Sequence, residues 1–414
     1  MKITHIHIER FRGFQNEDFE VGSLLTAIAG QNGTQKSTLL GIITQTFTLK
    51  TEDSMRVEKP LCGGSYISAF KDKFRLSPTF DKPKGHEWTI SFDAGMDDFT
   101  VESIKRTGDP NVRFWKKGAR QEGDGYISFP TIFLSLKRLV PVAEEAKIIT
   151  DDTLLTQEEL NEFKQLHNKI LIAQTPISSA TTITSKNKQS IGVSTELYDW
   201  NQNSMGQDNL GKIILALFSF KRLHDKYPRQ YKGGILAIDE MDATMYPASQ
   251  VELLKVLRKY ASKLNLQILF TTHSMSLLKA MDDLVQEVTK KEETANQAKI
   301  LYLKKVDDKI AIKQGVNFKG IQLDLNVVAE GNNRKKNRIT AYTEDKENIL
   351  FVKAILKSKD FVDVTLPCST LMELVTKRVP AFIYPYSIVI LDGDVRMNKN
   401  DLRKINNADN SIAQ

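Results

Sequence analysis

Cysteine and long hydrophobic runs are scarce in this sequence. Cys62 and Cys368 are the only cysteines among 414 residues, and neither has a metal-ligand spacing. No disulfide framework is indicated, which fits the reducing cytosol. No apolar run reaches the roughly 18 residues that a membrane-spanning helix needs, and the polar-interrupted N-terminus does not resemble a signal peptide. We therefore expect a cytoplasmic protein that does not enter a membrane.

A strong charge of one sign is also missing. The 58 lysines and arginines exceed the 51 aspartates and glutamates by a formal charge of +7. Such a balance permits contact with nucleic acid, but an ordinary charge background explains it equally well. The remaining composition is typical of a folded protein, with 41% hydrophobic and 26% charged residues. Because 414 residues exceed what one hydrophobic core usually supports, we expect two domains.

Alternating and apolar runs predict an α/β fold for the larger part of the chain. Residues 2–9 alternate as in an edge or early strand, and residues 22–30 form a short buried strand that enters a glycine loop. Residues 38–48 then have helical character. Residues 234–239 and 266–271 are strongly apolar strands, and the helical pattern between them predicts that they are parallel neighbours.

Two stretches interrupt this pattern. Residues 51–135 hold short β-prone runs broken by glycine, proline and aspartate, and they predict a β-rich lobe. Residues 151–195 predict a helical and loop insertion. Within it, residues 157–171 are expected to be helical, and the Ser- and Thr-rich residues 178–194 are expected to form a surface loop.

A glycine-rich segment stands between the first buried strand and the helix. Its order is Gly30, Gln31, Asn32, Gly33, Thr34, Gln35, Lys36, Ser37 and Thr38. In a P-loop, successive backbone N–H groups and the helix N-terminus hold phosphates. Lys36 is then expected to reach the β- and γ-phosphates, and the Ser37 hydroxyl to hold Mg²⁺. Gln35 stands where a P-loop usually has glycine. A glycine there lets the backbone approach the phosphate closely and can adopt a positive φ. The substitution therefore leaves open how fast this site hydrolyses ATP. A chance turn before a helix is the alternative for this segment alone.

Two adjacent acids end the apolar strand at residues 234–239. A buried strand is not expected to end in paired carboxylates without a chemical use. Asp239 is expected to bind the magnesium shell, and Glu240 to orient or deprotonate the attacking water. His273 follows the next strand and is expected to contact the γ-phosphate. A purely structural histidine is the alternative there.

Together these motifs resemble the ABC-type ATPases of the SMC and RecF-like group over residues 1–330, interrupted by the lobe at 51–135. The resemblance implies an ABC-type P-loop ATPase domain that uses ATP and Mg²⁺. The opening Ile8-Glu9-Arg10-Phe11-Arg12-Gly13-Phe14 looks like the first strand and turn of this family. There Arg12 is a candidate contact to the nucleotide or, equally, a surface arginine. Residues 241–247 stand where the family has its D-loop.

The segment Asn203-Ser204-Met205-Gly206-Gln207 looks like a degenerate form of the family's signature motif, and a helix is expected at residues 209–220. In this family, the signature of one subunit covers the γ-phosphate bound by the P-loop of another. The resemblance therefore implies that Ser204, Gly206 and Gln207 contact ATP. It also implies a head-to-tail homodimer, or a higher homo-oligomer, with composite ATP sites. The glutamine of the family's Q-loop has no assigned position.

A second acidic set lies in residues 338–414, beyond a polar boundary at residues 331–337. This part alternates strand, helix, strand and strand, which predicts a smaller α/β domain. Glu344 follows the first strand, and Asp392 and Asp394 follow a later one. This pattern resembles the Toprim fold, whose carboxylates bind Mg²⁺ for phosphodiester chemistry. Because the sequence ends soon afterwards, an incomplete domain is expected, and a cap with solvated acids is the alternative.

An ABC ATPase joined to a Toprim-like domain resembles the overcoming-lysogenisation-defect (OLD) nucleases and the ATPases of anti-phage systems such as Gabija. Residues 238–250 and the glycine-rich loop look most like the ATPase subunit of Septu systems, including those attached to retrons. In those systems a separate HNH nuclease is the partner. The resemblance implies a defence ATPase whose nucleotide state controls cutting of nucleic acid by this chain or by a partner. A RecF-like or SMC-like repair ATPase that clamps DNA without cutting is the alternative, although no long heptad run is present.

Overall fold

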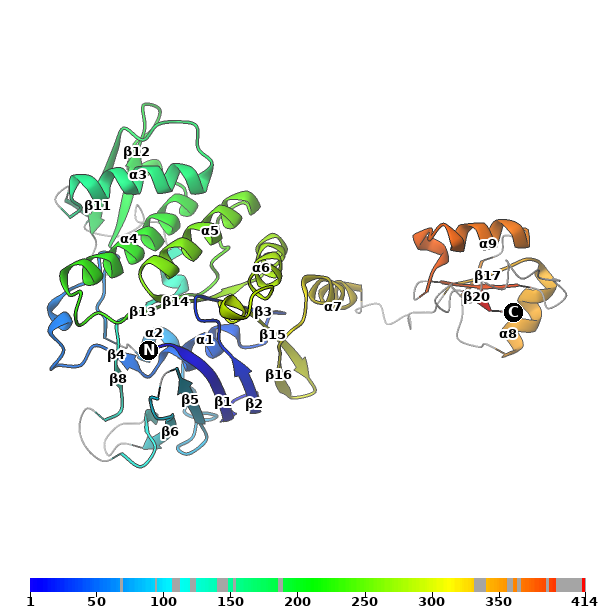
Figure 1. The fold of residues 1–414 in the computed structure, drawn as a ribbon, viewed down its shortest axis with the longest axis horizontal. Helices are drawn as coiled ribbons and strands as arrows, with labels where there is room; N and C mark the ends of the chain where they lie inside the picture. Colours follow the sequence, from blue (N-terminus) through cyan, green and yellow to red (C-terminus); the bar gives the residue numbers. More distant parts are fainter. Residues whose placement is uncertain are drawn as a thin grey trace. The chain divides into compact units, whose positions relative to one another are not determined.

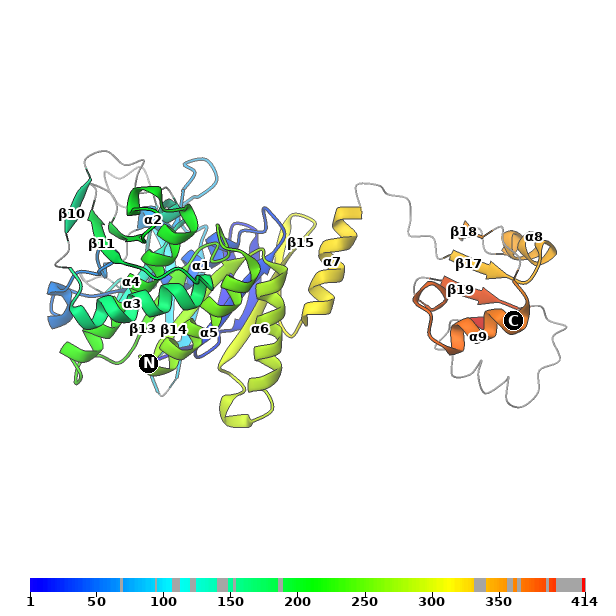
Figure 2. The same cartoon turned by 90° about the horizontal axis from the view of Figure 1, so that it is seen from above.

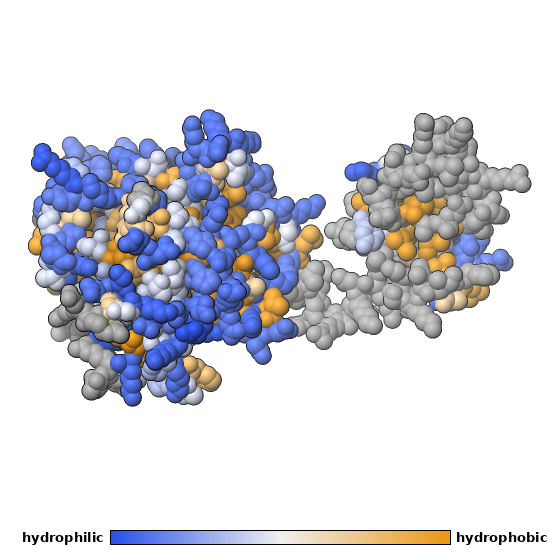
Figure 3. All heavy atoms as spheres, turned by 60° about the horizontal axis from the view of Figure 1, so that its bottom comes forward, coloured by the Kyte–Doolittle hydropathy of each residue, from blue (hydrophilic) through white to orange (hydrophobic). Residues whose placement is uncertain are grey.

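The structure is a computed structural model of the chain. It describes residues 1–67, 70–93, 95–105, 112–119, 124–139, 148–151, 154–184, 189–330, 340–355, 360–362, 366–384, 387–391 and 412–413. The chain divides into two compact units, Met1–Leu323 and Asp324–Gln414, and each is described by itself. Among the described residues, no helix is both long and apolar enough to cross a bilayer. Figure 3 shows hydrophilic side chains over most of the drawn face of the larger unit.

A six-stranded sheet forms the centre of the larger unit. Five strands are parallel, and β16 is antiparallel to its neighbour β15. Its central strands are buried along their whole length, as expected for a parallel sheet covered on both faces. The order is β16 (Lys309–Lys313), β15 (Ala298–Val306), β3 (Leu25–Gly30), β14 (Leu266–Thr272), β13 (Gly234–Ile238) and β9 (Thr131–Leu134).

Helices cover both faces of this sheet (Figures 1 and 2). One face carries α3 (Gln157–Leu171), α4 (Met205–Lys226), α5 (Pro247–Lys263) and α6 (Met275–Val288). The other face carries α1 (Lys36–Thr44), whose Leu39, Leu40, Ile42 and Ile43 share one core with a second sheet. This packing fixes the start of α1, and therefore the glycine-rich loop before it, against the ends of the parallel strands.

The second sheet of the larger unit is antiparallel. Its order is β2 (Phe14–Glu20), β1 (Ile3–Phe11), β5 (Glu87–Phe92), β6 (Phe99–Lys105) and β7 (Val112–Lys116). The alternation of residues 2–9 is confirmed as a strand, with Ile6 and Ile8 buried, but β1 lies inside the sheet and not at its edge. The β-rich character of residues 51–135 is confirmed as well. The last strand of residues 51–135, β9, does not belong to this antiparallel sheet but pairs with β13 in the main sheet.

Two expectations in the larger unit are wrong. The helix expected over residues 38–48 ends at Thr44, and β4 (Phe47–Thr48) pairs with β8 (Ile127–Ser128). The surface loop expected at residues 178–194 is instead a hairpin. It joins β10 (Ile149–Asp151) to β11 (Ser179–Thr184) and β12 (Gln189–Ser194) in a three-stranded antiparallel sheet. The physical reason is that the central residues of both β11 and β12, including Ile183, Ile191 and Val193, are buried.

The helix predicted at residues 157–171 is confirmed as α3. It begins with a capping box in which the Thr156 hydroxyl accepts from the Glu159 N–H, and the Glu159 carboxylate accepts from the Thr156 N–H. The remaining short elements of this unit are η1 (Ser54–Val57), α2 (Phe70–Lys73), η2 (Leu136–Leu139), η4 (Trp200–Gln202) and η5 (Glu292–Thr294). Helix α7 (Phe318–Glu330) follows β16.

The smaller unit holds a parallel sheet of order β18 (Asp360–Phe361), β17 (Thr340–Thr343), β19 (Ser387–Ile390) and β20 (Ile412–Ala413). Helix α8 (Lys346–Ile355) follows β17. Helix α9 (Cys368–Thr376) and η6 (Pro380–Phe382) stand between β18 and β19. The expected order of strand, helix, strand and strand therefore missed one helix, α9. Its Leu371, Met372 and Val375 form the small core with Val389 and Leu391. The predicted boundary at residues 331–337 lies outside the described residues.

Candidate nucleotide site

The glycine-rich loop joins the end of β3 to the start of α1, as the sequence predicts. Gln35 is the N-cap of α1 and adopts φ 62°, so it takes the left-handed conformation that a glycine would adopt easily. Its side chain does not cap the helix. The first N–H groups of α1 therefore have no side-chain acceptor at the N-cap, as in a site that receives an anion. Gly33 has φ 79°, with no heavy atom within 4 Å of where its Cβ would be.

Lys36 folds back over this loop. Its ammonium donates to the carbonyl oxygens of Gly30 at 3.1 Å and Gln31 at 2.8 Å. Burial lowers the pKa of Lys36 to about 8, although the nearby carboxylates of Asp239, Glu240 and Asp242 raise it. The cation is thus held in a position where it is partly desolvated. A polyphosphate would supply the negative charge that stabilises it.

Ser37 meets Asp239, 202 residues away, through a hydrogen bond of 2.8 Å from Oγ to Oδ1. Thr271 Oγ1 donates to the same carboxylate oxygen at 2.7 Å. The hydroxyl of Ser37 and the carboxylate of Asp239 are hard oxygen donors, which suit Mg²⁺. These two residues would hold the magnesium ion, which would neutralise phosphate charge and orient the γ-phosphate.

Glu240 is held through its backbone. Its N–H donates to Thr271 Oγ1 at 2.6 Å, and its carbonyl accepts from Arg138 Nη2 at 2.7 Å. Glu240 also has φ 50°, a strained conformation for a residue other than glycine. No side chain or backbone group of the described residues forms a hydrogen bond or ion pair with its carboxylate. The backbone of Glu240 is therefore held in position, and its carboxylate is available to bind a water molecule.

Sequence reasoning missed Arg138 and Thr271. Arg138 is 2% exposed, and its Nε donates to Asn209 Oδ1 at 2.7 Å. Its Nη1 donates to the carbonyls of Leu134 and Ser135. Burial lowers the pKa of Arg138 to about 10, against the raising effect of the nearby acids. Asn209 in turn donates to Ala243 O at 3.0 Å, so Arg138 links β9, α4 and the segment after Glu240.

We expect Arg138→Met to lower the turnover number for ATP roughly tenfold or more, because Glu240 loses the donor that holds its carbonyl. The affinity for ATP should change little, since Arg138 does not contact the glycine-rich loop. The free energy of unfolding should fall by about 2–4 kcal/mol, because buried acceptors lose their partner. Steady-state kinetics and urea unfolding measure both effects. Lys137→Met, at an exposed neighbour, serves as the control, and full turnover in a folded Arg138→Met chain would contradict this role.

His273 follows β14 on the same side of the site. Its backbone N–H lies 3.4 Å from both oxygens of the Asp242 carboxylate. Partial burial and the positive charge of Lys36 lower the pKa of His273, against the raising effect of Asp242, Glu240 and Asp239. The imidazole is therefore neutral at pH 7 and has one N–H to donate. Its place beside Lys36 and these acids agrees with a contact to phosphate.

The signature-like segment lies at the start of α4. Ser204 is the N-cap of α4 and forms a capping box with Gln207. Gly206 lies so close to Thr244 O that an added Cβ would stand 2.5 Å from it. Within the part of the chain that the structure describes, no hydrogen bond joins Ser204, Gly206 or Gln207 to the glycine-rich loop. One subunit therefore does not bring these two motifs together through direct polar contact.

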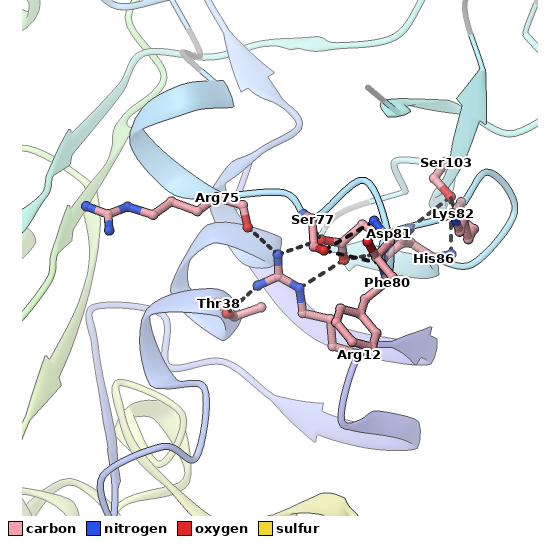
Figure 4. Close-up of polar contacts among 10 residues, drawn as sticks. Arg12, Thr38, Arg75, Ser77, Phe80, Asp81, Lys82, His86 and Ser103 are labelled. Carbon is pink, nitrogen blue, oxygen red and sulfur yellow. Dashed lines mark hydrogen bonds and ion pairs between the residues drawn. The ribbon is translucent and has the colours of Figure 1, made fainter. Parts of the chain in front are cut away.

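Arg12 lies at the turn between β1 and β2 and points to the start of α1 (Figure 4). Its Nη1 is 3.4 Å from Thr38 Oγ1. Its Nε and Nη2 each lie 3.0 Å from an oxygen of Asp81, which belongs to the lobe. Arg12 is thus next to the glycine-rich loop and is held there by Asp81, which the sequence analysis did not predict as part of the site.

The acids of the smaller unit are described only in part. Glu344 follows β17, at the carboxyl end of a parallel strand, as predicted. Its Oε1 accepts from the Cys368 N–H at 3.4 Å, and its Oε2 is buried with no hydrogen-bond partner in the structure. Asp392 and Asp394 lie outside the described residues. Among the residues that are described, no group of three or more His, Cys, Asp or Glu side chains is arranged to hold a metal ion.

Residues 135–278 match a protein-family model described as an AAA ATPase domain. This segment of the chain is therefore similar to an ATPase domain. The matched segment includes Asp239, Glu240, His273 and the signature-like segment, and it follows the glycine-rich loop in the sequence. The match implies that this domain binds and hydrolyses ATP. The uncapped start of α1, the buried Lys36 and the Ser37–Asp239 pair fit that ligand.

Solved structures similar to this chain include SMC head domains, and no curated protein sequence matches it. An SMC head domain from Thermotoga maritima has 14% identity and a TM-score of 0.42, with 76% of this chain and 100% of that chain covered. An SMC head bound to the C-terminal winged-helix domain of ScpA has 14% identity, a TM-score of 0.47, and coverage of 78% and 100%. An SMC head with an extended coiled coil, bound to a ScpA domain derived from Pyrococcus furiosus, has 13% identity, a TM-score of 0.43, and coverage of 79% and 99%.

Proposed function

We propose that this chain is the ATP-hydrolysing subunit of a bacterial anti-phage defence system, and that its nucleotide state controls nuclease action on nucleic acid. The observation that carries the enzymatic part is the convergence of Ser37, Asp239 and Thr271 beside Glu240. The defence role is supported by the sequence resemblance to OLD-family and Septu ATPases.

The residues of the site divide the work of hydrolysis. The glycine-rich loop and Lys36 bind the phosphates, and Ser37 and Asp239 hold Mg²⁺. Glu240 accepts a proton from the water that attacks the γ-phosphorus, and the bond to the β-γ bridging oxygen breaks to give ADP and phosphate. Neutral His273 donates a hydrogen bond to a γ-phosphate oxygen. Thr271 and Arg138 act by holding Asp239 and Glu240 in position.

We further propose that the working unit is a head-to-tail homodimer in which Ser204, Gly206 and Gln207 of one subunit contact the γ-phosphate held by the other. Ser204→Asp tests this well, because aspartate keeps the N-cap of α4 but places a negative charge against phosphate. We expect turnover to fall by at least roughly tenfold. Ser204→Asn is the matched control, since asparagine caps equally well without the charge.

Mixing two inactive chains makes the test specific for composite sites. A Lys36→Ala chain lacks a working P-loop, and a Ser204→Asp chain lacks a working signature. In a mixed dimer, one site combines the two intact motifs, so random mixing should restore roughly a quarter of the sites. Absence of any recovery, with both chains folded and exchanging subunits, would contradict the head-to-tail arrangement.

A nuclease assay of the purified chain separates the two forms of the defence hypothesis. The chain is incubated with DNA or RNA and with Mg²⁺ or Mn²⁺, in the presence and absence of ATP. Metal-dependent cutting that is lost in Asp392→Ala and Glu344→Gln would assign the cutting to the Toprim-like unit of this chain. ATP turnover without cutting would assign it to a separate partner such as an HNH nuclease. ATP-dependent DNA binding without any nuclease activity, alone or with a partner, would favour a repair clamp.

A further inference from the structure

Arg12 is held in a strained and specific position. It adopts φ 51° in the tight turn where Phe11 pairs with Phe14. A left-handed conformation is unfavourable for a residue other than glycine, so the surrounding contacts must stabilise it. Figure 4 shows those contacts converging on the guanidinium from residues 75–81 of the lobe and from Thr38 of α1. The turn therefore brings the lobe and the first turn of α1 to one side chain.

The partner of Arg12 in the lobe is Asp81. Its Oδ1 accepts from Arg12 Nε at 3.0 Å and faces His86 Nε2 at 3.1 Å. Its Oδ2 accepts from Arg12 Nη2 at 3.0 Å and from the Ser77 N–H at 2.7 Å. Burial opposes ionisation of Asp81, but the hydrogen bonds from Arg12, Ser77 and His86 outweigh it and lower its pKa to about 2. The Asp81 carboxylate thus stays ionised, and both of its oxygens accept hydrogen bonds from protein groups.

His86 contacts Asp81 on the side away from Arg12 Nη2, and Ser103 in turn contacts His86. Because a carboxylate only accepts hydrogen bonds, His86 Nε2 carries the proton, and Nδ1 is left to accept from Ser103 Oγ at 3.0 Å. Burial lowers the pKa of His86, against the raising effect of Asp81, which keeps the ring neutral at pH 7. His86 is 2% and Ser103 0% exposed, so neither can bind a substrate. Their contacts make a rigid frame for Asp81.

One edge of the guanidinium remains for another ligand. Nε and Nη2 are used by Asp81, and Nη2 also donates to Arg75 O at 2.7 Å. Nη1 faces Thr38 Oγ1 at the long distance of 3.4 Å. Thr38 follows Ser37 on α1, and Lys36 and Ser37 serve the β- and γ-phosphates. One N–H of Nη1 is therefore used by Thr38, and the other, which has no hydrogen-bond partner among the described residues, lies beside the first turn of α1.

We propose that Asp81 is a positioning residue for ATP binding, which fixes the Nη1 edge of Arg12 toward the nucleotide and so couples the lobe to the P-loop. This inference rests on the proposed use of ATP at the glycine-rich loop. Asp81 itself does not touch the ligand, because its oxygens are occupied by the lobe and by Arg12. An ion pair that only held the fold together would not need to place an N–H group of Nη1 without a protein partner beside α1.

The expected effect is on affinity. Asp81→Asn loses one charge and one acceptor, so Arg12 is no longer held by two parallel hydrogen bonds. The Kd and KM for ATP should rise roughly tenfold, which corresponds to one charge-assisted hydrogen bond. The turnover number at saturating ATP should change by less than about threefold. Arg12→Lys, which keeps the charge but cannot pair through two N–H groups, should show the same pattern and serves if Asp81→Asn does not fold.

A double-mutant cycle with a fluorescent ATP analogue separates positioning from general damage. Wild type, Arg12→Ala, Asp81→Asn and the double variant are compared by equilibrium binding. If Asp81 acts through Arg12, Asp81→Asn should cause no further loss of affinity in the Arg12→Ala chain. Glu87→Gln is the matched control, because Arg10 of β1 pairs through Nη2 with Glu87 of β5 at 3.0 Å in another arginine–carboxylate pair. Its affinity for ATP should equal that of wild type.

The outcomes distinguish this proposal from the proposed function. If Lys36→Ala abolishes binding but Arg12→Ala and Asp81→Asn bind as wild type does, the site uses ATP and the role of Asp81 is wrong. Equal losses of affinity from Asp81→Asn with and without Arg12 would also overturn it. If ATP binding is unaffected by Lys36→Ala, the proposed function itself fails.

Discussion

Glu240→Gln is expected to bind ATP with nearly wild-type affinity and to hydrolyse it at least roughly 100-fold more slowly. Glutamine has almost the shape of glutamate but cannot accept a proton from water. The backbone contacts that fix this residue, to Thr271 Oγ1 and Arg138 Nη2, do not involve the side chain and should persist. Single-turnover hydrolysis with equilibrium binding of ATP measures the two effects separately.

The same substitution should trap the ATP-bound dimer, because hydrolysis no longer releases it. Light scattering with size-exclusion chromatography in ATP and Mg²⁺ detects that species. Glu252→Gln, at a glutamate on α5 that pairs with Lys255, is the control for the loss of one acid elsewhere. Turnover by Glu240→Gln at the wild-type rate would remove Glu240 from the catalytic role.

Lys36→Ala is expected to weaken ATP binding by more than roughly 100-fold. The ammonium is the buried cation of the loop, with a pKa lowered to about 8 by desolvation, and the other charges around it are acidic. Without it, Asp239, Glu240 and Asp242 would repel the phosphates. Isothermal titration with ATP measures the loss, and Lys36→Met, which keeps most of the stem, tests whether packing contributes.

In the absence of nucleotide, the free energy of unfolding of Lys36→Met should lie within about 1 kcal/mol of the wild-type value. The substitution removes the two hydrogen bonds of Lys36 to Gly30 O and Gln31 O, which costs stability. It also removes the free-energy cost of burying a cation, and the two effects offset each other. Binding of ATP by a folded Lys36→Met chain with wild-type affinity would contradict the assignment of this loop.

The sequence predicted the parts of the site that depend on local chemistry. Lys36 and Ser37 stand at fixed spacing after a glycine, and Asp239 and Glu240 end an apolar strand, so each is recognisable alone. That Ser37 and Asp239 meet follows from the parallel sheet, whose strand ends share one edge. Gln35 departs from the usual P-loop pattern, and its positive φ shows that it takes the conformation of the missing glycine.

The residues that were missed act through partners far away in the chain. Arg138 is 102 residues from Glu240, and Asp81 is 69 residues from Arg12. A single arginine or aspartate in a polar stretch has no local signal that names its partner. The hairpin at residues 178–194 was missed for a different reason. Serine and threonine are common in loops, and only the burial of the central residues distinguishes these two strands from a surface loop.

ATP turnover by the purified wild-type chain in Mg²⁺, measured beside Lys36→Ala, tests the central claim most directly. We expect phosphate release by the wild type, loss of release when Mg²⁺ is chelated, and no release by Lys36→Ala. Equal release by both chains, or no binding of ATP by the wild type, would contradict the assignment of residues 30–38 as the site where ATP is bound and hydrolysed.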